Sequence, residues 1–70
     1  MEGEAIARLG RNLRAHRVAE GLSQEAFAEV LGVHRTYVGA LERGERNLHV
    51  GTVERLADRL DVTLHDLLCR

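Results

Sequence analysis

Apolar residues recur along most of this chain at the spacing of one face of an α-helix. Near the start, Ile6, Leu9 and Leu13 follow an i, i+3, i+7 pattern, which predicts an amphipathic helix. A later stretch repeats the i, i+3, i+4, i+7 spacing with Val53, Leu56, Ala57 and Leu60. No stretch alternates apolar and polar residues for long enough to compete as a strand. The pattern predicts an all-α fold, a compact five-helix bundle.

Glycines and short polar turns divide this pattern into five predicted helices. They cover about residues 4–19, 24–31, 35–43, 51–60 and 64–68. Ser23 is a favourable N-cap for the second helix, and Thr63 with Asp66 forms a capping-box pattern before the last. His34 and His49 precede the third and fourth helices, where Ser, Thr, Asp or Asn would cap better. We therefore expect water or neighbouring groups to satisfy those two helix ends.

The most informative stretch is QEAFAEVLGVHRTYVGALER, residues 24–43. Its first half ends at Gly32 and a second short amphipathic segment follows at once, which is the layout of a helix-turn-helix. The expected shared core consists of Phe27, Leu31, Val33, Val38 and Leu41. The face of the second helix that remains free of packing carries Arg35, Thr36, Gly39, Ala40 and Arg43. A face this short, flat and basic suits the floor of a DNA major groove.

The length of 70 residues allows one small domain, which we assign to the whole of residues 1–70. A core of this size is thin, so such domains are usually marginal unless they are stapled, bind a metal or oligomerise. The one cysteine, Cys69, is expected to be an incidental small apolar residue or a thiol near a dimer seam. No signal peptide or membrane-length apolar run is evident. We expect a cytoplasmic, nucleoid-associated protein with no membrane partner.

The overall charge argues weakly against a nucleic-acid partner. Ten Arg or Lys residues against eleven Asp or Glu residues give a formal net charge of −1, whereas many nucleic-acid binders are basic overall. Specific binders can still concentrate positive charge on one face. All ten cations are Arg, which suits bidentate contacts to guanine or phosphate and equally fits the codon usage of a GC-rich genome.

One arginine is expected inside the fold. Continuing the apolar stripe of the first helix by four residues leads from Leu13 to Arg17. A guanidinium that points inward requires a partner, because an unpaired buried charge is very costly. Glu42, four residues after Val38 on the inward edge of the third helix, is the best candidate. The alternative role for Arg17 is a direct contact to a DNA phosphate, and the two roles can overlap.

The stretch LSQEAFAEVLGVHRTYVGALERG, followed by a leucine-patterned helix and VTLHDLL, resembles the helix-turn-helix domain of phage repressor and Cro proteins, the XRE family. The resemblance covers about residues 9–68 and places Arg17 and Glu42 where the family has an interhelix ion pair. Within the family, RTYVGALERGERN most resembles the controller proteins of restriction–modification systems. The departures are the two capping histidines and Asp61, where a glycine is common.

The resemblance implies that the third helix is a recognition helix that enters the major groove of double-stranded DNA. Base contacts are then expected from Arg35, Thr36 and Ala40. Contacts to the DNA backbone are expected from Ser23, Gln24, Tyr37, Arg43, Arg46 and Asn47. For Tyr37 a purely structural role is an equal alternative, and the polar loop with Arg46 and Asn47 can also be simply solvated.

A homodimer is the expected assembly, because one such domain offers few contacts and dimers of this type bind near-palindromic half-sites. The region of about residues 48–70 has more apolar side chains than a thin monomer core requires. We assign Val62, Leu64 and Leu68 to the dimer interface. The alternative, in which these residues close the monomer core, is nearly as good for Leu64 and for Leu67.

Other classes of function find less support in the sequence. The four histidines are scattered singly and no glycine-rich loop is present to hold a nucleotide, so we expect neither an enzyme nor a metal site, cofactor or small-molecule ligand. The rival hypothesis is an antitoxin-like or other protein-interaction module. Antitoxins usually add a toxin-binding tail, and we expect none here beyond Arg70. We therefore expect a sequence-specific transcriptional regulator.

Overall fold

The computed structural model describes residues 1–69, and these form five α-helices without strands. The helices are α1 (Gly3–Ala19), α2 (Gln24–Leu31), α3 (Arg35–Glu42), α4 (Val50–Leu60) and α5 (Leu64–Leu68). The predicted all-α class is confirmed. Helix α3 is one residue shorter than predicted, and α1 and α4 each begin one residue earlier.

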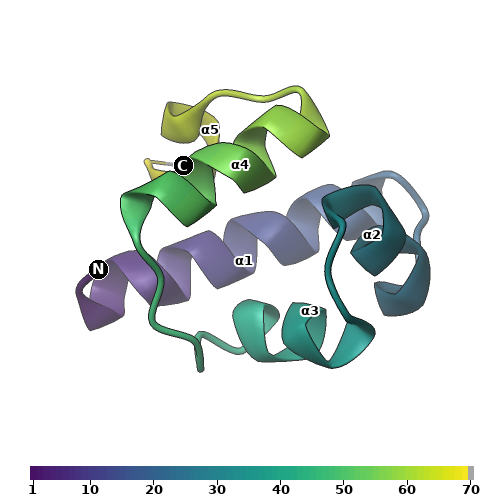
Figure 1. Ribbon diagram of the computed structural model, residues 1–70, viewed down its shortest axis with the longest axis horizontal. Helices are drawn as coiled ribbons and strands as arrows, with labels where there is room; N and C mark the ends of the chain where they lie inside the picture. Colours follow the sequence, from purple (N-terminus) through teal and green to yellow (C-terminus); the bar gives the residue numbers. More distant parts are fainter. Residues whose placement is uncertain (70) are drawn as a thin grey trace.

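Helix α1 is the longest helix and crosses the middle of the molecule, with α3 on one side of it and α4 and α5 on the other (Figure 1). Helix α2 closes one end of the bundle and joins α3 through a tight turn (Figure 1). All five helices contribute to one core. Its buried members are Leu9, Leu13, Phe27, Ala28, Leu31, Val38, Leu41, Leu48, Val53, Leu56, Ala57 and Leu67.

The helix ends follow local sequence signals, with one correction. The Ser23 hydroxyl accepts a hydrogen bond from the Ala26 amide, and Thr63 with Asp66 forms both bonds of a capping box. The expectation for His34 was wrong, because its Nδ1 accepts the Thr36 amide at 3.2 Å and caps α3 directly. His49 provides no side-chain cap for α4, as expected.

Gly10 is the point at which α1 crosses α3, a role that the sequence analysis missed. A Cβ atom added there would lie 2.8 Å from the carbonyl oxygen of Glu42 and closer still to that of Leu41. Any side chain at this position would therefore push α1 away from the backbone of α3. The absence of a side chain at Gly10 therefore allows the short separation between α1 and α3.

The ends of α2 and α4 use the left-handed backbone conformation. Gly32 after α2 has φ of 74°, which a glycine adopts without steric penalty. Asp61 after α4 has φ of 55° and is the only residue other than glycine with positive φ in the described chain. None of the five helices is both long enough and apolar enough to span a membrane.

Candidate nucleic-acid interface

The turn between α2 and α3 fixes which face of α3 remains free. The amide of Val33 donates to the carbonyl of Ala28 at 3.0 Å and closes the end of α2 at Gly32. The chain then reverses into α3, which buries Val38 and Leu41 against the core. Because those two residues occupy the inner side of a two-turn helix, the opposite side of α3 is left to solvent.

The free side of α3 carries the side chains that the sequence analysis assigned to base contacts. Arg35 and Thr36 are exposed at its N-terminal end, and Ala40 is half-buried one turn later. Arg35 has no ion-pair or hydrogen-bond partner within the described residues. Its guanidinium is therefore available to an external acceptor.

Gly39 lies on the same side of α3 as Arg35 and Thr36, as expected, but its own surface is buried. A Cβ atom at Gly39 would meet the Arg43 guanidinium at 3.1 Å and the Gln24 Oε1 atom at 3.7 Å. The two side chains converge over this glycine. A shallow hollow of about 360 Å³ results, lined by Gln24, Glu25, Arg35, Thr36, Gly39 and Arg43.

An ion pair joins α1, α2 and α3 beside this hollow. Arg17 Nε donates to Glu42 Oε2 at 2.7 Å and Arg17 Nη2 donates to Glu42 Oε1 at 3.0 Å. Gln24 Nε2 donates to the same Oε1 atom at 3.2 Å, and Arg17 Nη1 donates to the carbonyl of Leu22 at 3.0 Å. The pair anticipated from the sequence is thus present, with the Glu42 side chain only 4% exposed.

The ion pair has the geometry of a strong, charge-assisted fork. The hydrogen bond to Glu42 raises the pKa of the Arg17 guanidinium, against the opposing effect of burial. The guanidinium therefore stays charged, and the pair orients the Gln24 side chain at the start of α2. This places Gln24 at the edge of the exposed face of α3.

Several side chains expected to contact DNA, Thr36 at the bases and the others at the backbone, already have protein partners. The Ser23 hydroxyl caps α2, and Thr36 Oγ1 lies 2.8 Å from His34 Nδ1. Arg43 pairs with Glu45 at 3.0 Å, although its side chain remains 60% exposed. Asn47 Oδ1 accepts from the amino group of Met1 at 3.2 Å. These contacts are on exposed groups, which can exchange them for others.

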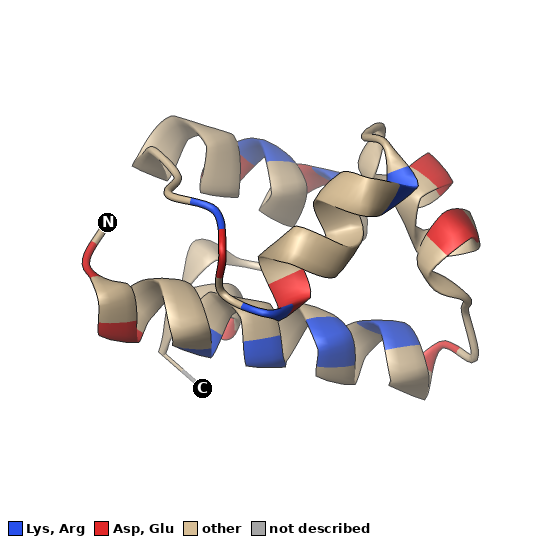
Figure 2. Ribbon diagram, turned by 90° about the horizontal axis from the view of Figure 1, so that it is seen from below, with Lys and Arg blue, Asp and Glu red and all other residues tan. Residues whose placement is uncertain are grey.

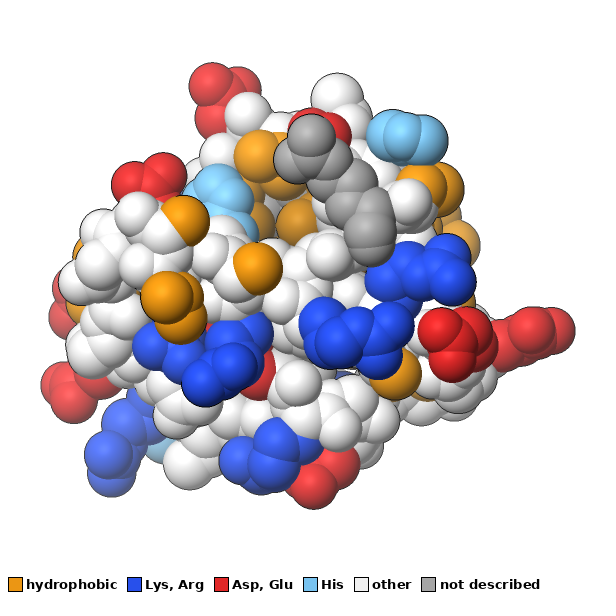
Figure 3. All heavy atoms as spheres, turned by 180° about the vertical axis from the view of Figure 1, so that it is seen from behind, with side chains coloured by type: hydrophobic (Ala, Val, Ile, Leu, Met, Phe, Trp, Pro, Cys, Tyr) orange, Lys and Arg blue, Asp and Glu red, His pale blue; other side chains and the backbone are white. Residues whose placement is uncertain are grey.

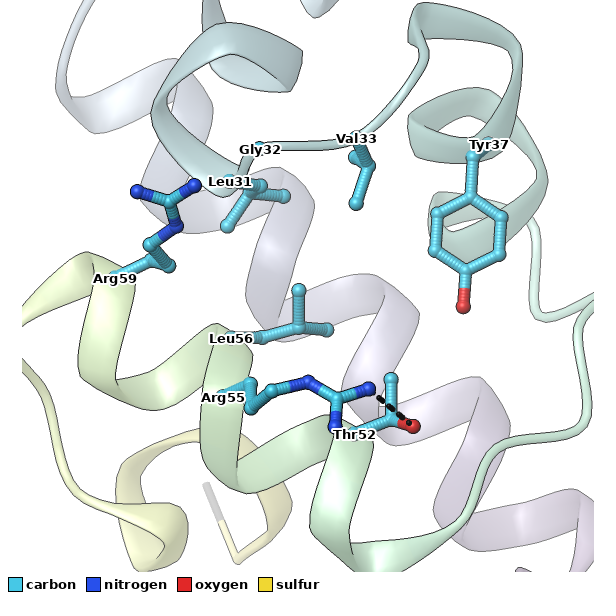
Figure 4. A pocket seen from close by; sticks show the side chains of 8 residues that line it. All are labelled: Leu31, Gly32, Val33, Tyr37, Thr52, Arg55, Leu56 and Arg59. Atoms are coloured by element: carbon cyan, nitrogen blue, oxygen red, sulfur yellow. Dashed lines mark hydrogen bonds between the residues drawn. The ribbon is translucent and has the colours of Figure 1, made fainter.

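Tyr37 lies on the side of α3 that faces α4. Its ring is half-buried against the core, and the Arg46 guanidinium stacks over it at 4.8 Å from the ring centroid. Its hydroxyl points into a groove between α3 and α4 (Figure 4). The groove is lined by Leu31, Gly32, Val33, Tyr37, Thr52, Arg55, Leu56 and Arg59. Tyr37 therefore positions Arg46 as well as filling space.

The three residues assigned to a dimer interface are all packed at the edge of the core. Each is partly buried and packs against the edge of the core from the C-terminal part of the chain. They are Val62, Leu64 and Leu68. Their remaining exposed area is apolar surface at the end of the bundle that α5 forms.

The fold and this site define a helix-turn-helix protein whose second helix presents polar side chains to solvent. The chain belongs to the helix-turn-helix family, whose family model matches residues 13–67. The resemblance to the phage repressor and Cro (XRE) group, and to restriction–modification controllers within it, is confirmed by individual relatives.

One of these relatives is the control protein C.SmaI of Serratia marcescens, which is 45% identical over 62 residues, covering 89% of this chain and 74% of that protein. A solved structure, the restriction–modification controller protein C.AhdI from Aeromonas hydrophila, superposes with a TM-score of 0.76 at 42% identity and covers 89% of this chain and 94% of that one. The biofilm regulator SinR, solved in complex with DNA, gives a TM-score of 0.72 at 31% identity over 86% of this chain and 97% of that one.

Proposed function

We propose that this protein is a sequence-specific, DNA-binding transcriptional regulator in which α3 reads the major groove. The observation that carries the proposal is the exposed face of α3, with Arg35 unpaired at its N-terminal end and the opposite face locked in the core. Relatives that include control proteins and a regulator solved with DNA support the same role. The protein binds DNA in the cytoplasm, at the nucleoid.

Reading of the bases begins at the N-terminal end of α3. The Arg35 guanidinium donates two parallel hydrogen bonds to O6 and N7 of a guanine, the commonest specific contact in the major groove. Thr36 adds a hydroxyl or a methyl contact, and Ala40 touches a thymine methyl group. Gly39 lets the helix settle deeply, because a larger residue would project into the hollow beneath Gln24 and Arg43.

Contacts to phosphates fix the register of α3 in the groove without reading sequence. The first turn of α2 supplies backbone amides and the positive end of a helix dipole, next to Ser23 and Gln24. Beyond α3, Arg43, Arg46 and Asn47 reach the opposite backbone, and Tyr37 supports Arg46 from below. On binding, Arg43 exchanges its contact with Glu45 for a phosphate.

The particular role that we propose is control of a restriction–modification system, by a homodimer bound to a near-palindromic operator. The likeness to C.SmaI and C.AhdI supports the first part. The apolar surface of Val62, Leu64 and Leu68 supports the second. With two copies of α3 about 34 Å apart, one on each half-site, the contacts of a small domain are doubled.

The experiment that tests this proposal is selection from a random duplex library by the purified protein. We expect enrichment of a near-palindromic sequence, with half-sites about one helical turn apart and a guanine at one fixed position in each. Failure to enrich any sequence, together with weak salt-sensitive binding to all duplexes, would contradict the proposal. That result would instead favour a helix-turn-helix module that serves a protein partner.

A further inference from the structure

The helix-turn-helix carries little free positive charge for a DNA-binding surface. Arg43, directly after α3, pairs with Glu45, and Arg17, which reaches α3 from α1, pairs with Glu42. The formal net charge of the chain is −1. Phosphate contacts nevertheless supply a large share of the affinity for DNA, and they need cations. Binding of DNA phosphates therefore calls for further cations outside α2 and α3.

Helix α1 provides such a source. Arg8, Arg11 and Arg14 follow one another on it at three-residue spacing. Arg11 and Arg14 are exposed, whereas Arg8 is half-buried and donates to the carbonyl of Leu68 at 3.4 Å. A single carboxylate, Glu4, serves the first two, at 3.6 Å from Arg8 and 3.7 Å from Arg11. These distances are long for ion pairs, and the three arginines outnumber the carboxylate. The ridge formed by these three arginines, here called the α1 ridge, is thus positive.

Arg14 is the most available cation of the α1 ridge. Its side chain is exposed, and none of the hydrogen bonds and ion pairs of the described residues involves it. Its helical neighbours at three and four residues are Gly10, Arg11, Arg17 and Val18. None of these is acidic, so no rotation of the Arg14 side chain along α1 finds a carboxylate.

The position of Arg14 on α1 brings it to the edge of α3. Gly10, four residues earlier, lies against the backbone of Leu41 and Glu42, and Arg17, three residues later, pairs with Glu42. Residues three or four apart share one side of a helix, so Arg14 lies on the side of α1 that borders α3. Gln24, which is bonded to the same Glu42 carboxylate, marks the start of α2 there.

The pictures agree with this placement. Seen from the side of α3, blue bands follow one another along α1, and α1 lies next to α3 (Figure 2). Seen from behind, Lys and Arg side chains gather in separate clusters across the face on which α1 lies (Figure 3). Positively charged side chains thus lie on α1 as well as on α3.

We propose that the α1 ridge, through Arg14 at its C-terminal end and Arg11 beside it, binds phosphates of the DNA backbone next to the segment read by α3. This inference rests on the proposed function and names a further part of its interface. Double-stranded DNA is the occupant because the ridge continues the exposed face of α3 and carries complementary charge.

The test measures salt-dependent affinity of the full chain for a duplex selected from the random library. Each lost phosphate contact reduces the slope of log K against log salt by about 0.9. At about 0.1 M salt this corresponds to an affinity about eightfold lower for Arg14→Gln, and the loss shrinks towards about 1 M salt. The same factor is expected on scrambled DNA, because phosphate contacts carry no sequence information.

Arg59→Gln is the matched control. It removes the same charge, and Arg59 lies beside Gly32 at the end of α2, across the groove from Tyr37 (Figure 4). Arg14→Lys is a second control, because an ammonium retains a phosphate contact as a point charge. The thermal unfolding midpoint of each variant shows whether the fold is intact.

A weaker affinity and smaller salt slope for Arg14→Gln, restored by Arg14→Lys and not reproduced by Arg59→Gln, would support the proposal. Equal affinities for Arg14→Gln, Arg59→Gln and the parent protein would overturn it and leave the proposed function standing. Failure of the parent protein to bind any duplex would overturn both. An equal loss in the Arg14 and Arg59 variants would also overturn it, since net charge alone would then explain the effect.

Discussion

Arg35 and Glu42 lie at the two ends of α3 and have different roles. Arg35 is exposed and has no partner within the described chain, whereas the Glu42 side chain is 4% exposed and holds Arg17. An arginine without an internal partner is free to form a bidentate contact to guanine. A buried carboxylate with two donors holds the helix in place. One residue therefore serves recognition and the other serves position.

Replacing Arg35 with alanine should relax selectivity at one base-pair position in each half-site. The loss of a bidentate contact corresponds to about 1–3 kcal/mol of discrimination. The measurement is a repeat of the library selection with Arg35→Ala, while thermal unfolding confirms an unchanged fold. A base preference identical to that of the parent protein would refute the reading role of Arg35.

Replacing Glu42 with alanine should strand the Arg17 charge and lower the free energy of unfolding by about 2–3 kcal/mol. This is below the usual cost of breaking a fully buried pair, because Arg17 is 14% exposed and keeps its bond to Leu22. Urea unfolding monitored by circular dichroism measures the change. Glu45→Ala, which removes an exposed partner of Arg43, should cost less than about 1 kcal/mol. Equal effects would disprove the structural role of Glu42.

The sequence predicted the residues whose roles depend on spacing along one helix. Arg17 continues an apolar stripe, and Ser23 and Thr63 precede apolar runs, so their partners could be anticipated. The cap provided by His34 could not, because an imidazole caps only in one rotamer and tautomer. The burial of Gly39 depends on Gln24 and Arg43, which converge from two different helices.

The packing of α1 on α3 determines the position of the recognition helix. Gly10 lets the two backbones approach, and the Arg17–Glu42 pair fixes them two turns further along α1. The apolar pattern predicted both helices but not their separation. A glycine inside a helix is an unfavourable choice by propensity alone. Only the contact with the backbone of α3 explains it.

Gly10→Ala should therefore destabilise the fold despite the better helix propensity of alanine. The added methyl group would meet two backbone carbonyls that cannot move aside, and we expect a loss of about 3 kcal/mol or an unfolded protein. Gly51→Ala is the control, since nothing lies within 4 Å of its added Cβ in α4. It should stabilise the fold by about 0.5 kcal/mol. Thermal unfolding of both variants decides, and equal shifts would contradict the close approach.

At the scale of the whole molecule, 70 residues build a small core with apolar surface left over at the α5 end. Domains of this size have little margin of stability, and association of two copies would bury that surface. Dimer formation would also join two copies of α3 to one operator. Stability, symmetry and specificity would then depend on the same contact.

Leu68→Asp should shift the protein from dimer to monomer and weaken binding to a palindromic duplex more than to a single half-site. A charge in the apolar seam cannot be buried without a partner. Sedimentation equilibrium measures the association, and circular dichroism confirms the helices. Val30→Asp, at an apolar side chain of α2 that is 40% exposed, should leave the dimer intact. A dimer that persists in the Leu68 variant would place the interface elsewhere.

The most direct test of the account is a pair of binding titrations with the parent protein at near-physiological salt. One uses the duplex recovered by selection, and the other uses a scrambled duplex of the same length and composition. We expect the recovered duplex to bind at least ~10³-fold more tightly, because base contacts from α3 add to phosphate contacts common to both. Affinities within about tenfold of each other would contradict sequence-specific recognition by this helix-turn-helix.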